Sequence, residues 1–392
     1  SFAAVQRNWS AYRKPLIYSA LTGVALGLYI DAWATGFLFE GIILLFIMLQ
    51  SILDHLRGKN IEYLCITSGI AFLVAILMVL PFVDSYYGFN HYIYSLFQPT
   101  ILLIGVVAVA SLAIMSGLIK EKGYAGYYYP ASLLGIAALG TFALYFILPQ
   151  FTKPLLAGFA IFQAKTGGAA TVGEAAALFS EGGVFSFDNV LRSFPGLGAM
   201  SGSFLAVLFS LFTLALIALI VIVVRSARFP KPAEVLILSW SAIILVMTLA
   251  QNRFTYYYAV NVAILTGFLV VWALQKVGMG SLDKELAGAD DQNKLIMSSL
   301  KLILAVVLIF VMIIYPSLSI SEIYAKSAGG PDSDWLTSTR WLQNNTPSPG
   351  MELYEKYVRP ADGKYAYPDA AYGIMSWWDY GHLIEVVGHR LP

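Results

Sequence analysis

Long apolar runs separated by short polar turns make up most of the chain up to residue 316. A helix needs about 20 apolar residues to cross the hydrocarbon of a bilayer, and about nine runs approach or exceed that length. Their approximate bounds are 15–30, 32–52, 62–83, 98–119, 128–149, 204–224, 233–250, 256–275 and 297–316. The stretch 15–53 is interrupted only by Asp31 and Glu40. Because a helix of about 39 residues would be roughly 60 Å long, this stretch is predicted to form two spans.

Basic residues alternate from one connection to the next, which predicts an orientation. Lys and Arg are retained on the cytoplasmic side of a membrane, so the connections rich in them are predicted to be inner ones. If residue 1 starts inside, an odd number of spans places the tail from Ser317 outside the cell or in a lumen. The cations of the predicted inner connections are Arg7, Arg13, Lys14, Arg57, Lys59, Lys120, Lys122, Arg225, Arg228, Lys231, Lys276, Lys284 and Lys294.

Composition supports the same class. Hydrophobic residues make up 58% of the chain and charged residues 12%, and the mean hydropathy is +0.72, which is typical of a polytopic membrane protein. The net charge of +1 argues against nucleic acid as a partner, since that needs a concentrated basic surface. The single cysteine, Cys65, excludes an internal disulfide. The chain starts at Ser1 without a methionine and ends at Pro392 within a domain, so we expect a piece of a longer protein.

Arg253 departs from the charge pattern, because it follows a span on the predicted outer side and precedes three tyrosines, Tyr256 to Tyr258. A guanidinium at this place suits an anionic lipid headgroup or phosphate, which it binds through charge-assisted, often bidentate hydrogen bonds. The alternative is an anchor within an interfacial belt of aromatic residues. The sequence alone leaves both interpretations open.

The longest interruption between spans is a predicted outer loop from 150 to 203, which carries Thr171-Val172-Gly173-Glu174 between two glycine pairs. Such long loops are often functional, and paired glycines suggest hinges. In that interpretation Glu174, at the start of a short apolar helix over 174–179, is carried into a site when the loop closes. The alternative is that Thr171 caps a surface helix and Glu174 completes its capping box.

The tail 317–392 changes character, with many Ser, Asp, Pro and Tyr residues. A helix is predicted around Asp334 to Asn345, and the tail is predicted to begin an outer soluble domain of mixed α/β structure. Its length of about 75 residues would give only a marginal core alone. Asn344-Asn345-Thr346 is a glycosylation triplet on the same predicted outer side.

Near the end of this tail stands Trp377-Trp378-Asp379-Tyr380-Gly381. Tryptophan and tyrosine close to a span often form an interfacial belt. This pair of indoles lies about 60 residues beyond the last apolar run, and exposing two indoles in a polar segment is costly unless they pack or bind. We therefore favour a binding role, with Asp379 receiving a hydroxyl or amide.

These residues resemble the catalytic subunit of oligosaccharyltransferases, the enzymes of asparagine-linked glycosylation. The Trp-Trp-Asp-Tyr-Gly run matches the signature of that family, and residues 171–174 resemble its Thr-Ile-X-Glu loop motif, with Val172 in place of Ile. Arg253 is similar to its characteristic arginine, and the predicted spans resemble the last nine of its thirteen. The run Ala371 to Ser376 looks most like the archaeal branch. The resemblance covers essentially the whole chain and implies a membrane domain of the GT-C type over 1–316.

The resemblance implies transfer of an oligosaccharide from a dolichyl or polyprenyl phosphate or pyrophosphate to Asn of Asn-X-Ser/Thr in an acceptor protein. Trp377, Trp378 and Asp379 would bind the Ser/Thr hydroxyl. Glu174 would reach the acceptor amide or a divalent metal, Mn²⁺ or Mg²⁺, and Arg253 would bind the lipid phosphate. The archaeal reading implies the plasma membrane.

One departure concerns the metal. The family carries its main metal ligands in outer loops between its first four spans, which would precede Ser1. The acidic pairs found here, Asp290-Asp291 and Asp332 with Asp334, lie on the predicted inner side and in the tail. We therefore expect the piece alone to be inactive, with the remaining ligands upstream.

Two alternatives stay open. A different membrane transferase using polyprenyl-linked sugars would share the architecture, but it would not need the Trp-Trp-Asp-Tyr-Gly pocket. A transporter would place charged residues or broken helices at the midplane of the membrane, whereas the charges here gather at helix ends, with Asp31 and Glu40 as the main exceptions.

Overall fold

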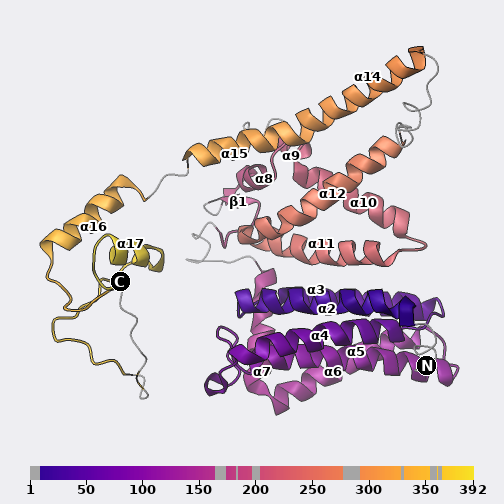
Figure 1. Ribbon diagram of the computed structural model, residues 1–392, viewed down its shortest axis with the longest axis horizontal. Coiled ribbons are helices and arrows are strands. Elements are labelled where there is room, and N and C mark those ends of the chain that lie inside the picture. Colours follow the sequence, from indigo (N-terminus) through magenta and orange to yellow (C-terminus); the bar gives the residue numbers. More distant parts are fainter. Residues whose placement is uncertain are drawn as a thin grey trace. The chain divides into compact units, whose positions relative to one another are not determined.

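The computed structural model describes residues 9–163, 174–181, 184–196, 204–276, 292–327, 331–353, 360 and 364–392. The chain divides into two compact units, Ser1–Ser317 and Leu318–Pro392, and each is described by itself. We call them the helical unit and the C-terminal unit. Figure 1 shows that α-helices account for nearly all of the regular structure in the helical unit.

The α-helices, in chain order up to the start of the C-terminal unit, are α2 (Trp9–Ala32), α3 (Leu38–Leu56), α4 (Glu62–Val79), α5 (Phe97–Glu121), α6 (Tyr128–Ile147), α7 (Pro149–Ala157), α8 (Asp188–Ser193), α9 (Phe204–Leu208), α10 (Leu211–Ser226), α11 (Pro232–Ala250), α12 (Thr255–Lys276), α14 (Gln292–Ile309) and α15 (Tyr315–Ser327). Short 3₁₀ helices are η1 (Leu80–Phe82), η2 (Ser85–Tyr87), η3 (Gly158–Phe162) and η6 (Asn252–Phe254), and a π-helical turn, η8 (Phe310–Ile314), joins α14 to α15. Strands β1 (Ser180–Glu181) and β2 (Val184–Phe185) form an antiparallel hairpin.

Eight helices among the described residues are long and apolar enough to cross a membrane. They correspond to eight of the nine predicted spans, and the division of 15–53 falls at the turn between Ala32 and Leu38. Many large apolar side chains on these helices are exposed, as expected for surfaces that face lipid rather than water. The prediction of a helical, polytopic membrane fold is confirmed.

The ninth predicted span, 204–224, differs from the expectation because the structure breaks it. It forms α9 and the 16-residue α10, with Phe209 and Ser210 between them. Ser210 is extended and buried, and its Oγ accepts a hydrogen bond from the N–H of Thr213. A serine in this position caps a new helix, and its pairing with Gly196 leaves no room for a side chain there, since a Cβ would lie 2.0 Å from the Phe209 carbonyl oxygen.

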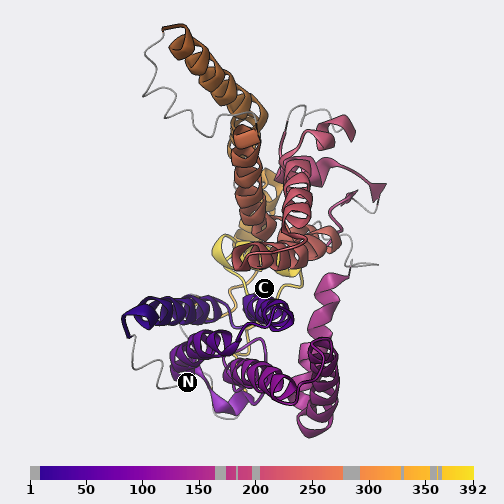
Figure 2. The ribbon, with the colours of Figure 1, turned by 90° about the vertical axis from the view of Figure 1, so that its right-hand side faces the viewer.

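Two apolar cores meet at α3. One core is formed by α2 to α6 and includes Phe72, Leu102 and Tyr129, all fully buried. The other is formed mainly by α8 to α12 and includes Leu178, Phe194 and Tyr258. Figures 1 and 2 show α3 between the two groups, in contact with α5 on one side and α11 on the other.

The basic turns gather at one end of the helices. Arg57, after α3, donates a hydrogen bond from Nη1 to the carbonyl of Pro230 at 3.3 Å, just before α11. Lys120, near the end of α5, donates from Nζ to the carbonyl of Lys59. The turn after α2 belongs to the opposite end, where the Gln98 amide donates to the carbonyl of Ala34 at 2.8 Å.

The described part of the C-terminal unit contains α16 (Ser333–Asn345), η9 (Trp378–Tyr380) and α17 (Gly381–Val386), with an isolated parallel bridge between Gly373 and Leu391. The helix predicted around Asp334 to Asn345 is confirmed as α16. Asp332 caps it by accepting a hydrogen bond from the N–H of Asp334 at 3.0 Å. The pair Asp332 and Asp334 therefore serves the start of a helix.

Candidate functional site

Arg253 and Glu174 are joined through their backbones. The α11 helix ends at Ala250, and the chain turns through the extended residue Gln251 into η6 before α12 begins. At this turn the N–H of Arg253 donates to the carbonyl of Glu174 at 2.8 Å, and the N–H of Asn252 donates to the carbonyl of Ala176 at 2.7 Å. The structure thus brings together the two residues that the sequence singled out in separate segments.

A third backbone bond and two buried side chains strengthen this attachment. The N–H of Leu178 donates to the carbonyl of Leu249 at 3.3 Å. Ala176 and Leu178 are buried, and Leu178 belongs to the core around α10 to α12. Buried backbone groups need partners, and the end of a helix has free carbonyls. The pairing meets both needs, so the segment after Glu174 is fixed to the turn after α11.

Gln251 holds the other side of the same connection. Its side chain is fully buried, and its Nε2 donates to the carbonyls of Ile161 and Gln163 at 3.1 Å each. Thr248, also buried, donates from Oγ1 to the carbonyl of Phe254 at 3.2 Å. The turn that carries Arg253 is therefore held by the start of the long connection, at Ile161 and Gln163. It is also held by residues 174–178 farther along the same connection.

The side chains of Arg253 and Glu174 are exposed. The guanidinium carbon of Arg253 lies 5.2 Å from the centre of the buried Phe254 ring, a cation–π contact that orients it without neutralising it. Among the described residues the two side chains form no ion pair with each other, so both charges can meet a ligand.

The short helix expected over 174–179 is not formed, and that expectation is wrong. Residues 174–179 form turns, whose backbone groups bond to residues 249–253. The capping-box interpretation of Glu174 required the same helix, so the structure does not support it. Thr171, Val172 and Gly173 lie outside the described residues, as do the two glycine pairs and Asp290-Asp291.

In the C-terminal unit the signature residues form a tight turn. The N–H of Tyr380 donates to the carbonyl of Trp377 at 3.0 Å, and the indole Nε1 of Trp377 donates to Oδ2 of Asp379 at 2.9 Å. Trp377 is 53% exposed. Its hydrogen bond orients the carboxylate and leaves Oδ1 free of this bond to accept another donor. The side chain of Trp378 lies outside the described residues.

Tyr380, the fourth signature residue, packs against α16. Its ring stacks on Trp335 with centres 3.9 Å apart and planes inclined by 19°. Two residues that support the candidate sites, Trp335 and Gln251, were not predicted from the sequence. Neither carried a sequence signal, because Gln251 follows an apolar run like many helix ends and Trp335 is a lone aromatic residue.

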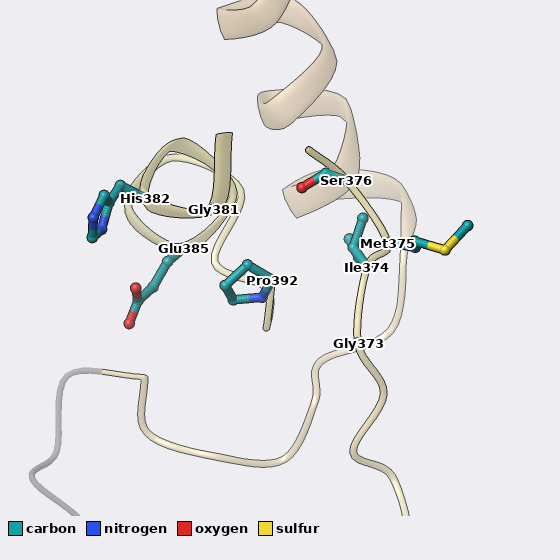
Figure 3. Close-up of a pocket in the computed structure, with 8 residues that line it drawn as sticks. All are labelled: Gly373, Ile374, Met375, Ser376, Gly381, His382, Glu385 and Pro392. Atoms are coloured by element: carbon teal, nitrogen blue, oxygen red, sulfur yellow. The ribbon is translucent and has the colours of Figure 1, made fainter. Parts of the chain in front are cut away.

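An open groove of about 680 Å³ is lined by residues that precede the signature turn in sequence and by residues that follow it. Figure 3 shows Pro392 lying between the stretch that precedes the signature and the α17 helix that follows it. The groove is lined by Gly373, Ile374, Met375, Ser376, Gly381, His382, Glu385 and Pro392.

The described residues do not fit a metal centre by themselves. No group of three or more His, Cys, Asp or Glu side chains among them is close enough to hold an ion. A divalent cation such as Mn²⁺ or Mg²⁺ needs several oxygen ligands, and Glu174 supplies one carboxylate.

Residues 332–392 match the sequence profile of the AglB core domain. Dolichyl-phosphooligosaccharide-protein glycotransferase 3 of Archaeoglobus fulgidus is 29% identical over 391 residues, which cover 97% of this chain and 43% of the relative. Dolichyl-monophosphooligosaccharide-protein glycotransferase AglB of Haloferax volcanii is 30% identical, over 98% of this chain and 42% of the relative. This chain is similar to archaeal oligosaccharyltransferases along nearly its whole length. It spans a little over two fifths of the relatives it matches, and it is an integral membrane protein.

Solved structures of oligosaccharyltransferases from A. fulgidus share this fold. AglB in complex with an inhibitory peptide and a dolichol-phosphate superposes with a TM-score of 0.81 at 27% identity, covering 99% of this chain and 44% of that one. The enzyme tethered to an acceptor peptide with the sequon NVT gives 0.72 at 25%, covering 99% and 43%. A complex with Zn and sulfate gives 0.64 at 23%, covering 96% and 39%, a likeness of fold alone.

Proposed function

We propose that this chain is part of a glycosyltransferase that moves an oligosaccharide from a dolichyl or polyprenyl phosphate or pyrophosphate to Asn of Asn-X-Ser/Thr. The observation that carries the proposal is the backbone pairing that sets Glu174 beside Arg253. It places one anion and one cation, both exposed, at the same helix end. The similarity to archaeal enzymes described with dolichol-phosphate and with a sequon peptide supports it.

In this function Arg253 binds the lipid phosphate. The reaction forms a bond between the acceptor amide nitrogen and the anomeric carbon, and it breaks the bond from that carbon to the phosphate oxygen. The leaving phosphate takes the electron pair. A guanidinium on a fixed turn is suited to that charge, because its paired donors match phosphate geometry and the backbone that carries it is held before the reaction.

Glu174 would hydrogen-bond to the acceptor amide, and its carboxylate would take the proton that the amide loses in the transfer. Because the carbonyl of Glu174 is bonded to the N–H of Arg253, the amide and the leaving phosphate would be received by one fixed turn. Such fixed orientation of two reactants is a major source of rate. Mn²⁺ or Mg²⁺ would need ligands other than Glu174 outside the described residues.

Trp377, Trp378 and Asp379 would select the acceptor by receiving the Ser/Thr hydroxyl. The bond from the Trp377 indole to one oxygen of Asp379 leaves the other for that hydroxyl. A site built to bond a hydroxyl rejects peptides that lack it. The adjacent groove, lined by residues that precede and follow the turn in sequence, gives room for the peptide.

The arrangement in the cell follows from the same proposal. Residues 1–316 would form the transmembrane domain, with 150–203 as an outer loop, and 317–392 would begin the outer soluble domain. The membrane would be the archaeal plasma membrane, with the first helix starting in the cytoplasm. The clustering of Arg57, Lys59, Lys120 and the turn at Pro230 at one helix end supports this orientation.

The test measures glycan transfer by the full-length protein, with lipid-linked oligosaccharide, Mn²⁺ and a labelled Asn-X-Thr peptide. We expect transfer that disappears when Ala replaces the Thr of the peptide. Equal transfer to the Ala peptide, or none to either peptide with an intact donor, would overturn the proposed function.

A further inference from the structure

Arg390 is a buried guanidinium that follows the signature and closes the end of α16. It is 5% exposed. Its Nε donates to Oγ1 of Thr346 at 2.7 Å, and its Nη2 donates to the carbonyls of Gln343, at 2.9 Å, and Thr346. Its Nη1 donates to the carbonyl of His389 at 2.8 Å. All these acceptors are neutral. The cation is stabilised because each of its three nitrogens donates a hydrogen bond, and because it lies at the negative end of the helix dipole.

Thr346 is also contacted by Tyr372, which precedes the signature in the chain. The phenol of Tyr372 donates to the carbonyl of Pro347 at 2.5 Å and lies 3.0 Å from Oγ1 of Thr346. Oγ1 itself donates to the carbonyl of Leu342 at 2.6 Å. Tyr372 precedes the signature and Arg390 follows it, so both flanks of the signature converge on one residue at the end of α16.

The two flanks are also joined to each other. The N–H of Ile374 donates to the carbonyl of Leu391 at 2.9 Å, next to the bridge between Gly373 and Leu391. Because the signature lies between these attachments, and Tyr380 stacks on Trp335 at the other end of α16, its turn is a loop whose two ends are fixed on one helix.

We propose that Arg390 is a positioning residue for acceptor binding: through Thr346 it fixes the signature loop on α16 and so holds Asp379 where it receives the acceptor hydroxyl. This inference rests on the proposed function. Arg390 itself contacts no substrate. A lysine cannot replace it, because one ammonium group cannot reach Thr346, Gln343 and His389 as a planar fork does.

The test compares Arg390→Met with Arg340→Met in the full-length protein. Arg340 lies on α16, the helix whose end Arg390 bonds, is exposed, and has the same side-chain charge. For Arg390→Met we expect the acceptor KM to rise about tenfold or more, equivalent to the loss of one charge-assisted hydrogen bond, with the donor KM and kcat within about twofold of wild type. Arg390→Lys should recover little of the acceptor KM, and Arg340→Met should match wild type.

Two further measurements separate positioning from a general loss of folding. Thr346→Val should also raise the acceptor KM. The double variant with Arg390→Met should raise it by less than the product of the two single effects, because both substitutions remove the same contact between Arg390 and Thr346. Hydrogen exchange of the Ile374 amide should accelerate in Arg390→Met while amides within α12 stay protected. An unchanged acceptor KM with unchanged exchange would overturn the inference. Donor and acceptor KM rising together, with loss of protection in both units, would overturn it too.

The exchange measurement needs no glycan transfer. If the wild-type protein transfers nothing, the proposed function fails, while faster Ile374 exchange in Arg390→Met still supports the attachment and unchanged exchange refutes it.

Discussion

The backbone N–H of Arg253 donates to the carbonyl of Glu174 at 2.8 Å. This bond joins a turn between two membrane-spanning helices to a segment in the middle of the longest connection of the helical unit. It leaves both side chains free of the attachment. Their charges can therefore be changed separately without breaking the bond that brings them together.

Replacing Arg253 by Ala should weaken use of the lipid donor. Removing a cation that bonds to phosphate costs about 1.5–3 kcal/mol, so the donor KM should rise roughly 10-fold to 100-fold while the acceptor KM stays unchanged. Steady-state transfer at varied donor concentration measures this. Lys153→Ala, which removes an exposed cation from α7 in the same connection, is the control. An unchanged donor KM in Arg253→Ala would contradict phosphate binding.

Glu174→Gln should lower the rate of transfer without lowering stability. The carbonyl of Glu174, and not its carboxylate, bonds to Arg253, so the turn should keep its place when the charge is lost. We expect kcat to fall at least about tenfold, as for loss of a group that acts on the amide in the transition state. Melting temperature in detergent should stay within about 2 °C. Unfolding of this variant would instead show a structural role.

Gln251→Leu should destabilise the turn that carries Arg253. It leaves the carbonyls of Ile161 and Gln163 without their donor, at an expected cost of about 1–3 kcal/mol. Thermal unfolding and exchange of the Arg253 amide measure the effect. Gln163→Ala is matched to it, because it removes an exposed side chain and keeps the carbonyl. Equal melting temperatures for the two variants would show that the anchor contributes nothing.

Trp377→Phe should reduce the preference for hydroxyl-bearing acceptors. The phenyl ring keeps most of the apolar surface but lacks the N–H that orients Asp379. Asp379→Ala should have the larger effect, since it removes the acceptor of the hydroxyl. The ratio of kcat/KM for Asn-X-Thr and Asn-X-Ala peptides is the measure. A ratio equal to that of wild type in both variants would remove these residues from acceptor selection.

Asn344 should carry no glycan in the folded protein, although Asn344-Asn345-Thr346 is a glycosylation triplet. The hydroxyl of Thr346 already accepts a hydrogen bond from Arg390 and donates one to Leu342, and Asn344 lies in the last turn of α16. Mass spectrometry of the purified protein should find Asn344 unmodified, whereas a free peptide spanning 340–350 should serve as an acceptor. A glycan on Asn344 of the folded protein would contradict this.

Eight of the nine predicted spans and the α16 helix follow from the sequence alone. The spans follow from apolar runs of sufficient length, because a backbone in hydrocarbon must bond within its own helix. The α16 helix follows from Asp332 as a cap and from the loss of helix-forming residues at Pro347. The single broken run shows the limit of this reasoning, since apolar length does not reveal that Ser210 pairs with Gly196.

Which chemical groups meet depends on how distant segments pack. The bond between Arg253 and Glu174, the anchoring of Gln251 and the convergence of Tyr372 and Arg390 on Thr346 all join segments far apart in the chain. Sequence patterns of period 3.6 or 2 describe how one segment buries its own face. They carry no information about which distant carbonyl accepts a given N–H, because that choice is made when the segments pack.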